Sequence, residues 1–267
     1  NFDPETRLTP DHAFKFVNKT EGHPVRLGEQ SIRFELRRGD CGVSSGGYDD
    51  CAIKSSSGMT SERHELLLDP DVSPFKKITW NTYSIFLPED FPLLDPHFMP
   101  AGHITMGQLH GDGDGAVGFQ WDIGEGGGYV VNRRTGCFLP ENKKKRCSVS
   151  NPQNNTQEVI PKDKLLGKWH DIVLNVNWTK KQNGYLKQWI NGQLVYHYQG
   201  NTDTPGETEQ FQMGIYRGPL PSTPKNLTQI AYFDQVRFAK SCEKLKLEDL
   251  GYSCEELESQ KILTIDT

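Results

Sequence analysis

The chain has 267 residues, 34% of them hydrophobic and 24% charged, a composition that excludes extensive disorder. Its 30 basic and 35 acidic residues give a net charge of −5 at pH 7. This balance argues against a general nucleic-acid binder, since such proteins usually carry a basic excess. No apolar run approaches about 18 residues, the length of a membrane-spanning helix. We expect one domain over residues 1–267 that is monomeric and contacts neither nucleic acid nor membrane.

Short segments with period-two alternation dominate the chain and predict β-strands. The clearest strands are expected at residues 31–37, 78–87, 116–123, 169–178, 185–198 and 229–238. Within 185–198, Asn191 and Gly192 separate two strand-like runs and predict a tight hairpin turn. Helical turns are expected only near the C-terminal end, at 243–250 and 254–260. The predicted fold class is therefore all-β, an antiparallel sandwich of two sheets.

Six cysteines fall in three pairs that are close in sequence: Cys41/Cys51, Cys137/Cys147 and Cys242/Cys254. Local pairs of this kind are typical of disulfides in secreted proteins. Free thiols and metal ligation remain alternatives, although no pair has the closer spacing of a zinc-binding motif. Four N-x-[ST] sequons are compatible with a secretory route. We therefore expect a secreted, extracellular protein stabilised by disulfides.

The first candidate functional segment is Ser61-Glu-Arg-His-Glu-Leu66. If this segment is a strand, its alternation places Arg63 and Glu65 on one face and His64 on the other. Arg63 and His64 therefore cannot both reach the same substrate group unless a bulge intervenes.

Two further segments carry polar residues with the same alternation. In the segment 107–111, Gln108 and His110 share a face, and in the segment 212–218, Gln212 and Tyr216 share one. An arginine, an amide, a histidine and a tyrosine together suit β-elimination from a uronic acid. This reaction needs the carboxylate charge neutralised, a base for the C5 proton and an acid for the leaving O4.

These motifs, R-x-E-L, Q-x-H and G-x-Y, resemble the signature of jelly-roll polysaccharide lyases such as the alginate lyases. The wider sequence is similar to the glucuronan lyase, ulvan lyase and heparin lyase I relatives, from about residue 12 to 240. The segments that carry this resemblance are 23–26, 33–36, 169–171, 189–192 and 214–217. The resemblance implies a β-jelly-roll (concanavalin A-like) fold and a lyase that cleaves a uronate polysaccharide internally by β-elimination.

The resemblance also implies roles for individual residues. Tyr216 matches the catalytic tyrosine, which acts as base, acid or both, and Gln108 and Arg63 match the groups that neutralise the carboxylate. His110 matches the histidine of Q-x-H, while His64 stands where alginate lyases have serine or threonine. Both histidines remain candidates for the catalytic one. Gln212 replaces the lysine of the alginate lyases, which favours a substrate other than alginate.

Further residues are expected to contact a glucuronic or iduronic acid polymer, with ulvan slightly favoured over glucuronan. Arg133 and Arg217 are candidates for sulfate or carboxylate contacts, because arginine binds such oxyanions in a bidentate manner. The resemblance also implies a structural calcium ion with Asp234 as a ligand. The remaining candidates for substrate contact are Glu65, Gln120, Asn175, Tyr185, Lys187, Trp189 and Gln212.

Two other functions fit the same fold. A lectin-like carbohydrate-binding module would need neither His110 nor Tyr216. A glycoside hydrolase would need two suitably spaced carboxylates, whereas Glu62 and Glu65 fall on opposite faces of their segment. The lyase is therefore favoured over both.

Overall fold

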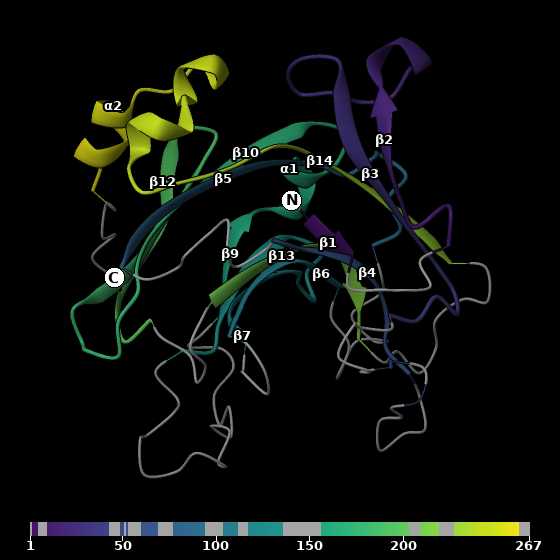
Figure 1. Cartoon of the computed structure of the whole chain (residues 1–267), viewed down its shortest axis with the longest axis horizontal. Helices are drawn as coiled ribbons and strands as arrows, with labels where there is room; N and C mark the ends of the chain where they lie inside the picture. Colours follow the sequence, from purple (N-terminus) through teal and green to yellow (C-terminus); the bar gives the residue numbers. More distant parts are fainter. Residues whose placement is uncertain are drawn as a thin grey trace.

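The computed structural model describes residues 2–4, 10–42, 49–50, 52, 60–68, 77–93, 104–111, 117–135, 156–202, 209–218 and 227–261. Its strands form two seven-stranded sheets that lie one above the other as curved layers (Figure 1). Every pairing between these strands is antiparallel. This arrangement confirms the predicted all-β sandwich of the jelly-roll class.

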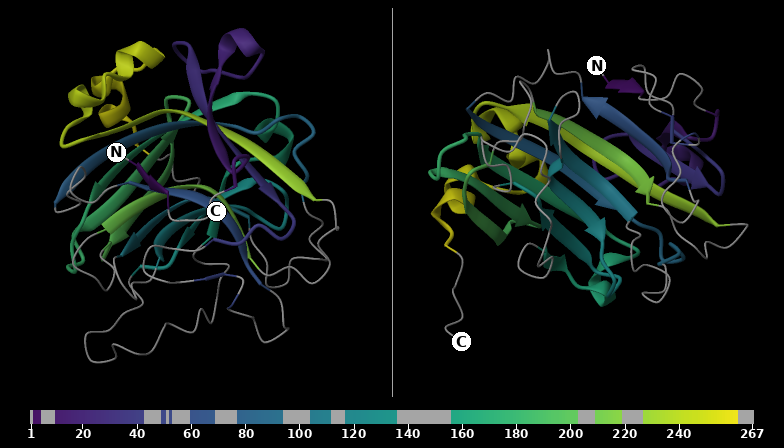
Figure 2. Two further views of the ribbon diagram at one scale, coloured as in Figure 1. Left: turned by 45° about the vertical axis from the view of Figure 1, so that its right-hand side comes forward. Right: turned by 90° about the horizontal axis from the view of Figure 1, so that it is seen from below.

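The first sheet, sheet A, contains in spatial order β1 (Phe2–Pro4), β4 (Glu62–Leu68), β13 (Glu209–Arg217), β6 (Ile104–Gly111), β7 (Val117–Ile123), β8 (Tyr129–Arg133) and β9 (Thr156–Ile160). The second, sheet B, contains β12 (Gln193–Gly200), β11 (Gly184–Ile190), β10 (Trp169–Asn177), β5 (Ile78–Phe86), β14 (Thr228–Ala239), β3 (Gln30–Arg37) and β2 (Phe14–Asn18). Seen from below, the strands of sheet A lie side by side across the molecule (Figure 2).

The hydrophobic core lies between the sheets and follows the period-two pattern of the strands. Alternate residues of each strand turn inward and lose almost all contact with water, which is the main favourable term in folding. The phenolic oxygens of Tyr83 and Tyr129 lie 3.2 Å apart in this core, and each hydroxyl thereby gains a hydrogen-bond partner. The fully buried aromatic side chains include Phe34, Tyr83, Phe119, Trp121, Tyr129, Phe211 and Phe233.

The predicted strands are found in the described residues, and so is the predicted hairpin. Asn191 and Gly192 have φ values of 50° and 79°, the left-handed conformation that a tight turn between β11 and β12 requires. The edge strands β2 and β9 were not predicted. In β9 three of the five residues are exposed, and in β2 the side chain of Phe16 is 62% exposed, so neither shows a clean alternation.

The C-terminal segment packs on the outer face of sheet B, where it is drawn in yellow in Figure 1. The helical turns predicted there are found, the first as two 3₁₀ turns. The rings of Trp80 and Trp189 stack at 5.6 Å beneath this segment, and the indole N–H of Trp189 donates to the Leu257 carbonyl at 3.0 Å. None of the helices in the described part of the chain has the length and apolar character needed to cross a lipid bilayer. The helices are η1 (Lys19–Glu21), α1 (Lys162–Leu165), η4 (Cys242–Leu245), η5 (Leu247–Leu250) and α2 (Cys254–Ser259).

A buried carboxylate, Asp171 of β10, joins three segments on this outer face. It accepts hydrogen bonds from Arg26 at 2.9 and 2.7 Å, from Ser84 at 2.7 Å and from the hydroxyl of Tyr252 at 2.7 Å. Burial acts to raise the pKa of Asp171, but these hydrogen bonds outweigh it and lower the pKa below its ordinary value. Asp171 therefore stays charged and ties the C-terminal segment to the sheet.

The predicted pairing of Cys242 with Cys254 is confirmed by a disulfide within the C-terminal segment. Cys41 is also disulfide-bonded. The other predicted pairings involve Cys51, Cys137 and Cys147, which lie outside the described residues.

Replacing both Cys242 and Cys254 with Ser is expected to lower the free energy of unfolding by about 2–3 kcal/mol, because the unfolded chain then gains the entropy of an open loop. Urea denaturation followed by tryptophan fluorescence measures the change, since Trp80 and Trp189 lie beneath this segment. An unchanged midpoint would show that the apolar contacts alone hold the segment in place.

Candidate active site

Polar side chains cover the face of sheet A that is turned away from sheet B. Two rows run across the strands at right angles to them. In the first row, Gln212, Gln108, Gln120 and Asn132 lie opposite one another on β13, β6, β7 and β8. In the second row, Arg63, Tyr216, Thr105 and Asp122 lie opposite one another on β4, β13, β6 and β7. We call these eight side chains the polar face of sheet A.

A bulge in β6 brings the two rows onto one face. The pairing of β6 with both neighbours shifts beside Met106, which turns into the core. Because of this extra residue, Thr105 and Gln108 share a face although simple alternation would separate them. Bulges of this kind often lie next to active sites, where they re-aim a side chain.

Gly214 lies where β13 passes this bulge, and its φ of 147° is a conformation that residues with side chains rarely adopt. A Cβ atom there would overlap the His64 carbonyl oxygen and come within 2.8 Å of the Glu65 Cα. The missing side chain therefore lets β4 approach β13 closely, two residues before Tyr216.

Arg63 is held by two acidic residues and a tyrosine ring. Its guanidinium donates to Asp50 at 2.6 and 3.0 Å, and it lies 3.4 Å from a carboxylate oxygen of Glu65. The guanidinium carbon lies 4.2 Å from the centre of the Tyr216 ring, within the range of a cation–π contact. These contacts fix the guanidinium in one orientation on the polar face.

Glu65 connects this arginine with the amide row. The side-chain amide of Gln108 donates to the two Glu65 oxygens at 3.0 and 3.1 Å and to Gln212 at 2.6 Å. All three side chains are buried, at 5% exposure or less. Glu65 was predicted to bind substrate, but its described contacts are with Arg63 and Gln108, which it holds in place.

Tyr216 points its hydroxyl toward Ser61, with the two oxygens 3.2 Å apart. Burial raises the pKa of Tyr216 above its ordinary value, although the Ser61 hydrogen bond and the Arg63 charge partly offset this. The phenol is therefore protonated at neutral pH and is a proton donor in this state.

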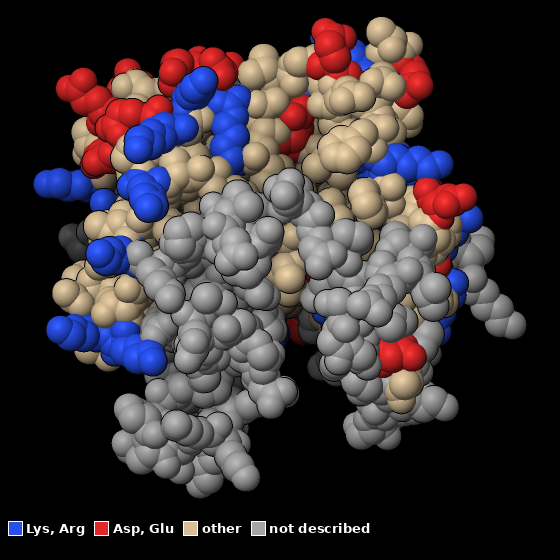
Figure 3. All heavy atoms as spheres, in the orientation of Figure 1, with Lys and Arg blue, Asp and Glu red and all other residues tan. Residues whose placement is uncertain are grey.

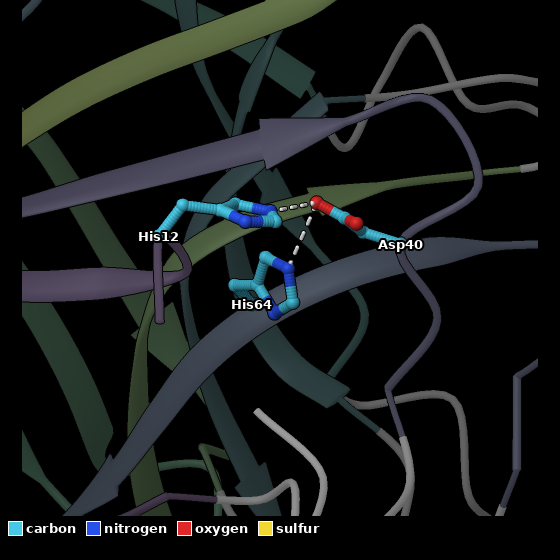
Figure 4. Close-up of side chains that lie close together, drawn as sticks. All are labelled: His12, Asp40 and His64. Atoms are coloured by element: carbon cyan, nitrogen blue, oxygen red, sulfur yellow. Dashed lines mark hydrogen bonds and ion pairs between the residues drawn. The ribbon is translucent and has the colours of Figure 1, made fainter. Parts of the chain in front are cut away.

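The two candidate histidines lie in different places. His64 is 2% exposed and lies on the opposite face of β4 from Arg63, beside His12 and Asp40 (Figure 4). The alternation predicted for this segment is confirmed, and a role for His64 beside Arg63 and Tyr216 is not compatible with this position. His110 lies in β6, two residues after Gln108, and its side chain lies outside the described residues.

Two predicted oxyanion-binding arginines do not belong to the polar face. Arg217 is fully buried on the core side of β13, where its Nε donates to Glu62 at 2.6 Å. Arg133 lies opposite the core residue Phe119, with its guanidinium 4.4 Å from the centre of the Tyr198 ring. Both predictions are wrong because strand alternation turns these two side chains toward sheet B.

Four other predicted contact residues share a face, but it is the outer face of sheet B. In the β10–β11 ladder, Asn175 lies opposite Lys187, with Tyr185 and Trp189 on the same side. Trp189 is 1% exposed beneath the C-terminal segment, and the Asn175 amide donates to the Thr79 carbonyl. These residues cannot contact a substrate on sheet A, and the prediction erred in assigning their strands to the wrong sheet.

Asp234 was expected to be a calcium ligand. Its Oδ2 accepts the backbone N–H groups of Arg26 and Leu27 at 2.8 and 3.2 Å, and its Oδ1 accepts that of Gln235 at 2.6 Å. Calcium requires six to eight oxygen ligands, whereas both oxygens here face N–H donors. These contacts do not match a calcium site, and Asp234 instead ties the loop before β3 to β14.

Several residues of the site were not predicted as members of it. Asp50 lies between the first two cysteines, where no strand pattern signals its contact with Arg63. Thr105 was missed because only the bulge beside Met106 brings it to the polar face. Asn132 could have been found from the pairing of β7 with β8, which the sequence does not specify.

The family comparison assigns the chain. A family model described as polysaccharide lyase matches residues 17–237. The chain belongs to this polysaccharide lyase family. It is therefore an enzyme that cleaves a polysaccharide by elimination, and the lectin-like and hydrolase alternatives are set aside.

Two solved structures share the arrangement of this lyase. Endo-β-1,4-glucuronan lyase from the fungus Trichoderma reesei superposes with a TM-score of 0.53 at 12% identity, covering 90% of this chain and 95% of that one. Alginate lyase vAL-1 from Chlorella virus gives a TM-score of 0.49 at 13% identity, covering 86% of this chain and 90% of that one. The first of these supports the fold alone. A comparison with curated proteins gave no match.

Replacing Gly214 with Ala is expected to lower the free energy of unfolding by about 3 kcal/mol or more, through overpacking against β4 and a strained φ. The lyase activity of the folded fraction should fall as well, because Tyr216 and Arg63 lose their register. Gly126 is the matched control, since a Cβ there meets nothing within 4 Å, and Gly126→Ala should change stability by less than about 0.5 kcal/mol. Equal unfolding midpoints for the two variants would contradict the role of Gly214.

Proposed function

We propose that this polysaccharide lyase cleaves a uronic acid polymer internally by β-elimination on the polar face of sheet A. The observation that carries the proposal is the convergence of Arg63, Gln108 and Tyr216 from three neighbouring strands onto one face. They supply a cation, an amide and a proton donor, the groups that β-elimination from a uronate requires.

Arg63 and Gln108 act on the substrate carboxylate. Charge that develops at C5 when its proton leaves spreads into this carboxylate, so donors aimed at it stabilise the transition state. Asp50 and Glu65 keep these donors oriented before substrate arrives, which avoids reorganisation during the reaction.

Tyr216 is proposed as the acid and His110 as the base. His110 takes the proton from C5, the electron pair of that bond forms the C4–C5 double bond, and the C4–O4 bond breaks. The raised pKa of Tyr216 keeps the proton on its hydroxyl until O4 leaves and accepts it. No water is consumed, and the new chain end carries a 4,5-unsaturated uronate.

The substrate proposed is a polymer of unsulfated glucuronic acid, with ulvan as the alternative. The preference for a sulfated polymer depended on Arg133 and Arg217, both of which turn toward sheet B. Among the described residues, the polar face presents one arginine and a row of amides, which suits one carboxylate and many hydroxyls. With about 4.8 Å between strands, the amide row spans roughly 14 Å, longer than a single sugar ring.

The outer surface over sheet B offers no comparable site for an anionic polymer. Acidic side chains gather over the C-terminal segment, at the upper left of Figure 3. The exposed acidic residues of this segment are Glu243, Glu248, Asp249, Glu255, Glu256 and Glu258. A polyuronate would be repelled there, which favours binding on sheet A.

The test is the ultraviolet absorbance of the unsaturated product with glucuronan, ulvan, heparan sulfate and alginate as substrates. The wild-type protein is expected to act on glucuronan, and Tyr216→Phe should lower kcat by about 10²–10⁴-fold because the proton donor is lost. Tyr185→Phe is the matched control on sheet B and should keep wild-type turnover. Wild-type turnover in Tyr216→Phe would refute the role of Tyr216, and activity on ulvan alone would refute the choice of an unsulfated polymer.

The pH profile tests whether Tyr216 acts as acid or base. The positive charge of Arg63 lowers the pKa of Tyr216, so Arg63→Gln should raise that pKa further. If the protonated phenol is required, the basic limb of kcat/KM moves to higher pH in this variant, and overall activity falls. Movement of the acidic limb instead would show that Tyr216 works as a phenolate base. Arg133→Gln is the control and should leave both limbs in place.

A further inference from the structure

Three side chains from separate segments converge on the core side of β4. His12 precedes β2, Asp40 follows β3, and His64 lies within β4 (Figure 4). The Nε2 atoms of His12 and His64 lie 2.9 and 3.0 Å from the same oxygen, Oδ2 of Asp40. One potential ligand atom from each residue lies within 4.8 Å of the other two.

His64 is buried without a hydrogen-bond partner. It is 2% exposed, and within the part of the chain that the structure describes neither of its ring nitrogens makes a hydrogen bond. Its Nε2 is close to Asp40, but the direction of approach is not that of a hydrogen bond. Buried polar groups are almost always satisfied, and an exception calls for an explanation such as a bound ion.

A metal ion explains both the convergence and the missing hydrogen bonds. Ligands of a tetrahedral ion with bonds of about 2.0–2.1 Å lie roughly 3.3 Å apart and aim their lone pairs at the ion rather than at one another. Two imidazoles and one carboxylate suit zinc and related transition metals, whereas calcium prefers oxygen ligands. We propose that His12, Asp40 and His64 bind one transition-metal dication, for which zinc is the probe.

The surroundings allow such an ion to enter and to complete its coordination. The side chains of His12 and Asp40 are 21% and 14% exposed, so one side of the group reaches solvent. Water can fill the fourth position, as in other three-ligand zinc sites. The Arg37 backbone N–H donates to Asp40 at 2.7 Å and helps to orient this ligand.

The ion would act as a clamp and not as a catalyst. It lies on the face of β4 opposite Arg63, where it joins β4 to the segments before β2 and after β3. The ion does not touch the polar face, so the proposal stands independently of the uronate substrate and of the roles of Tyr216 and His110.

The experiment removes metal from the full chain with EDTA and titrates it with zinc, measuring bound metal per chain and the thermal unfolding midpoint. One zinc ion per chain is expected, and zinc at a hundredfold excess over its dissociation constant should raise Tm by roughly 5–10 °C. Cobalt should give the visible absorption spectrum of a site with nitrogen and oxygen ligands.

His12→Ala is the main variant, because the partly exposed His12 can be removed with little damage to the core. It should fold without metal, bind zinc at least tenfold more weakly and lose the Tm shift, and Asp40→Asn should behave in the same way. His197→Ala is the matched control, because His197 is exposed on β12 and should leave zinc binding unchanged. The proposal is overturned if the wild-type chain binds no stoichiometric zinc, or if His12→Ala and Asp40→Asn both bind within twofold of it.

Discussion

Strand β4 buries four consecutive ionisable residues, and much of the structure around it serves to compensate them. Glu62, His64 and Glu65 are at most 3% exposed, and Arg63 is partly buried. An isolated charge in such a place would cost several kcal/mol, so each needs a partner. On the core side, Glu62 pairs with Arg217 and His64 contacts Asp40, while on the outer side Arg63 and Glu65 pair with each other and with Asp50 and Gln108. The polar face of sheet A is thus one half of a network that runs through the strand.

This division explains which expectations from the sequence succeed. Alternation within a segment is a local property, so the opposite placement of Arg63 and His64 and the turn at Asn191–Gly192 could be predicted. The pairing partners of each strand depend on contacts far apart in the chain. For that reason Tyr185 and Lys187 share a face as expected, yet that face belongs to the other sheet. Arg217 was taken for a ligand-binding residue because nothing in its own segment reveals Glu62 as its partner.

The bulge in β6 and the glycine in β13 mark where local patterns fail for a structural reason. The polar face contains Thr105 only because one extra residue, Met106, breaks the alternation. Gly214 had suggested room for a ligand, but the space beside it is filled by the backbone of β4. Both departures lie beside Tyr216, in keeping with the rule that active sites tolerate irregular backbone which the rest of a sheet avoids.

The two sides of β4 are also mechanically connected. Arg63 and His64 are adjacent, so any group that holds His64 from the core side limits the movement of Arg63 on the outer side. Asp50 and Glu65 limit that movement from the outer side, with contacts of 2.6 and 3.4 Å to the guanidinium. A donor that must meet a carboxylate in its transition-state position gains from such support on both sides, because its charge contributes most when no reorganisation is needed. The cost of burying charges in β4 is therefore offset by a site that is already in place before substrate binds.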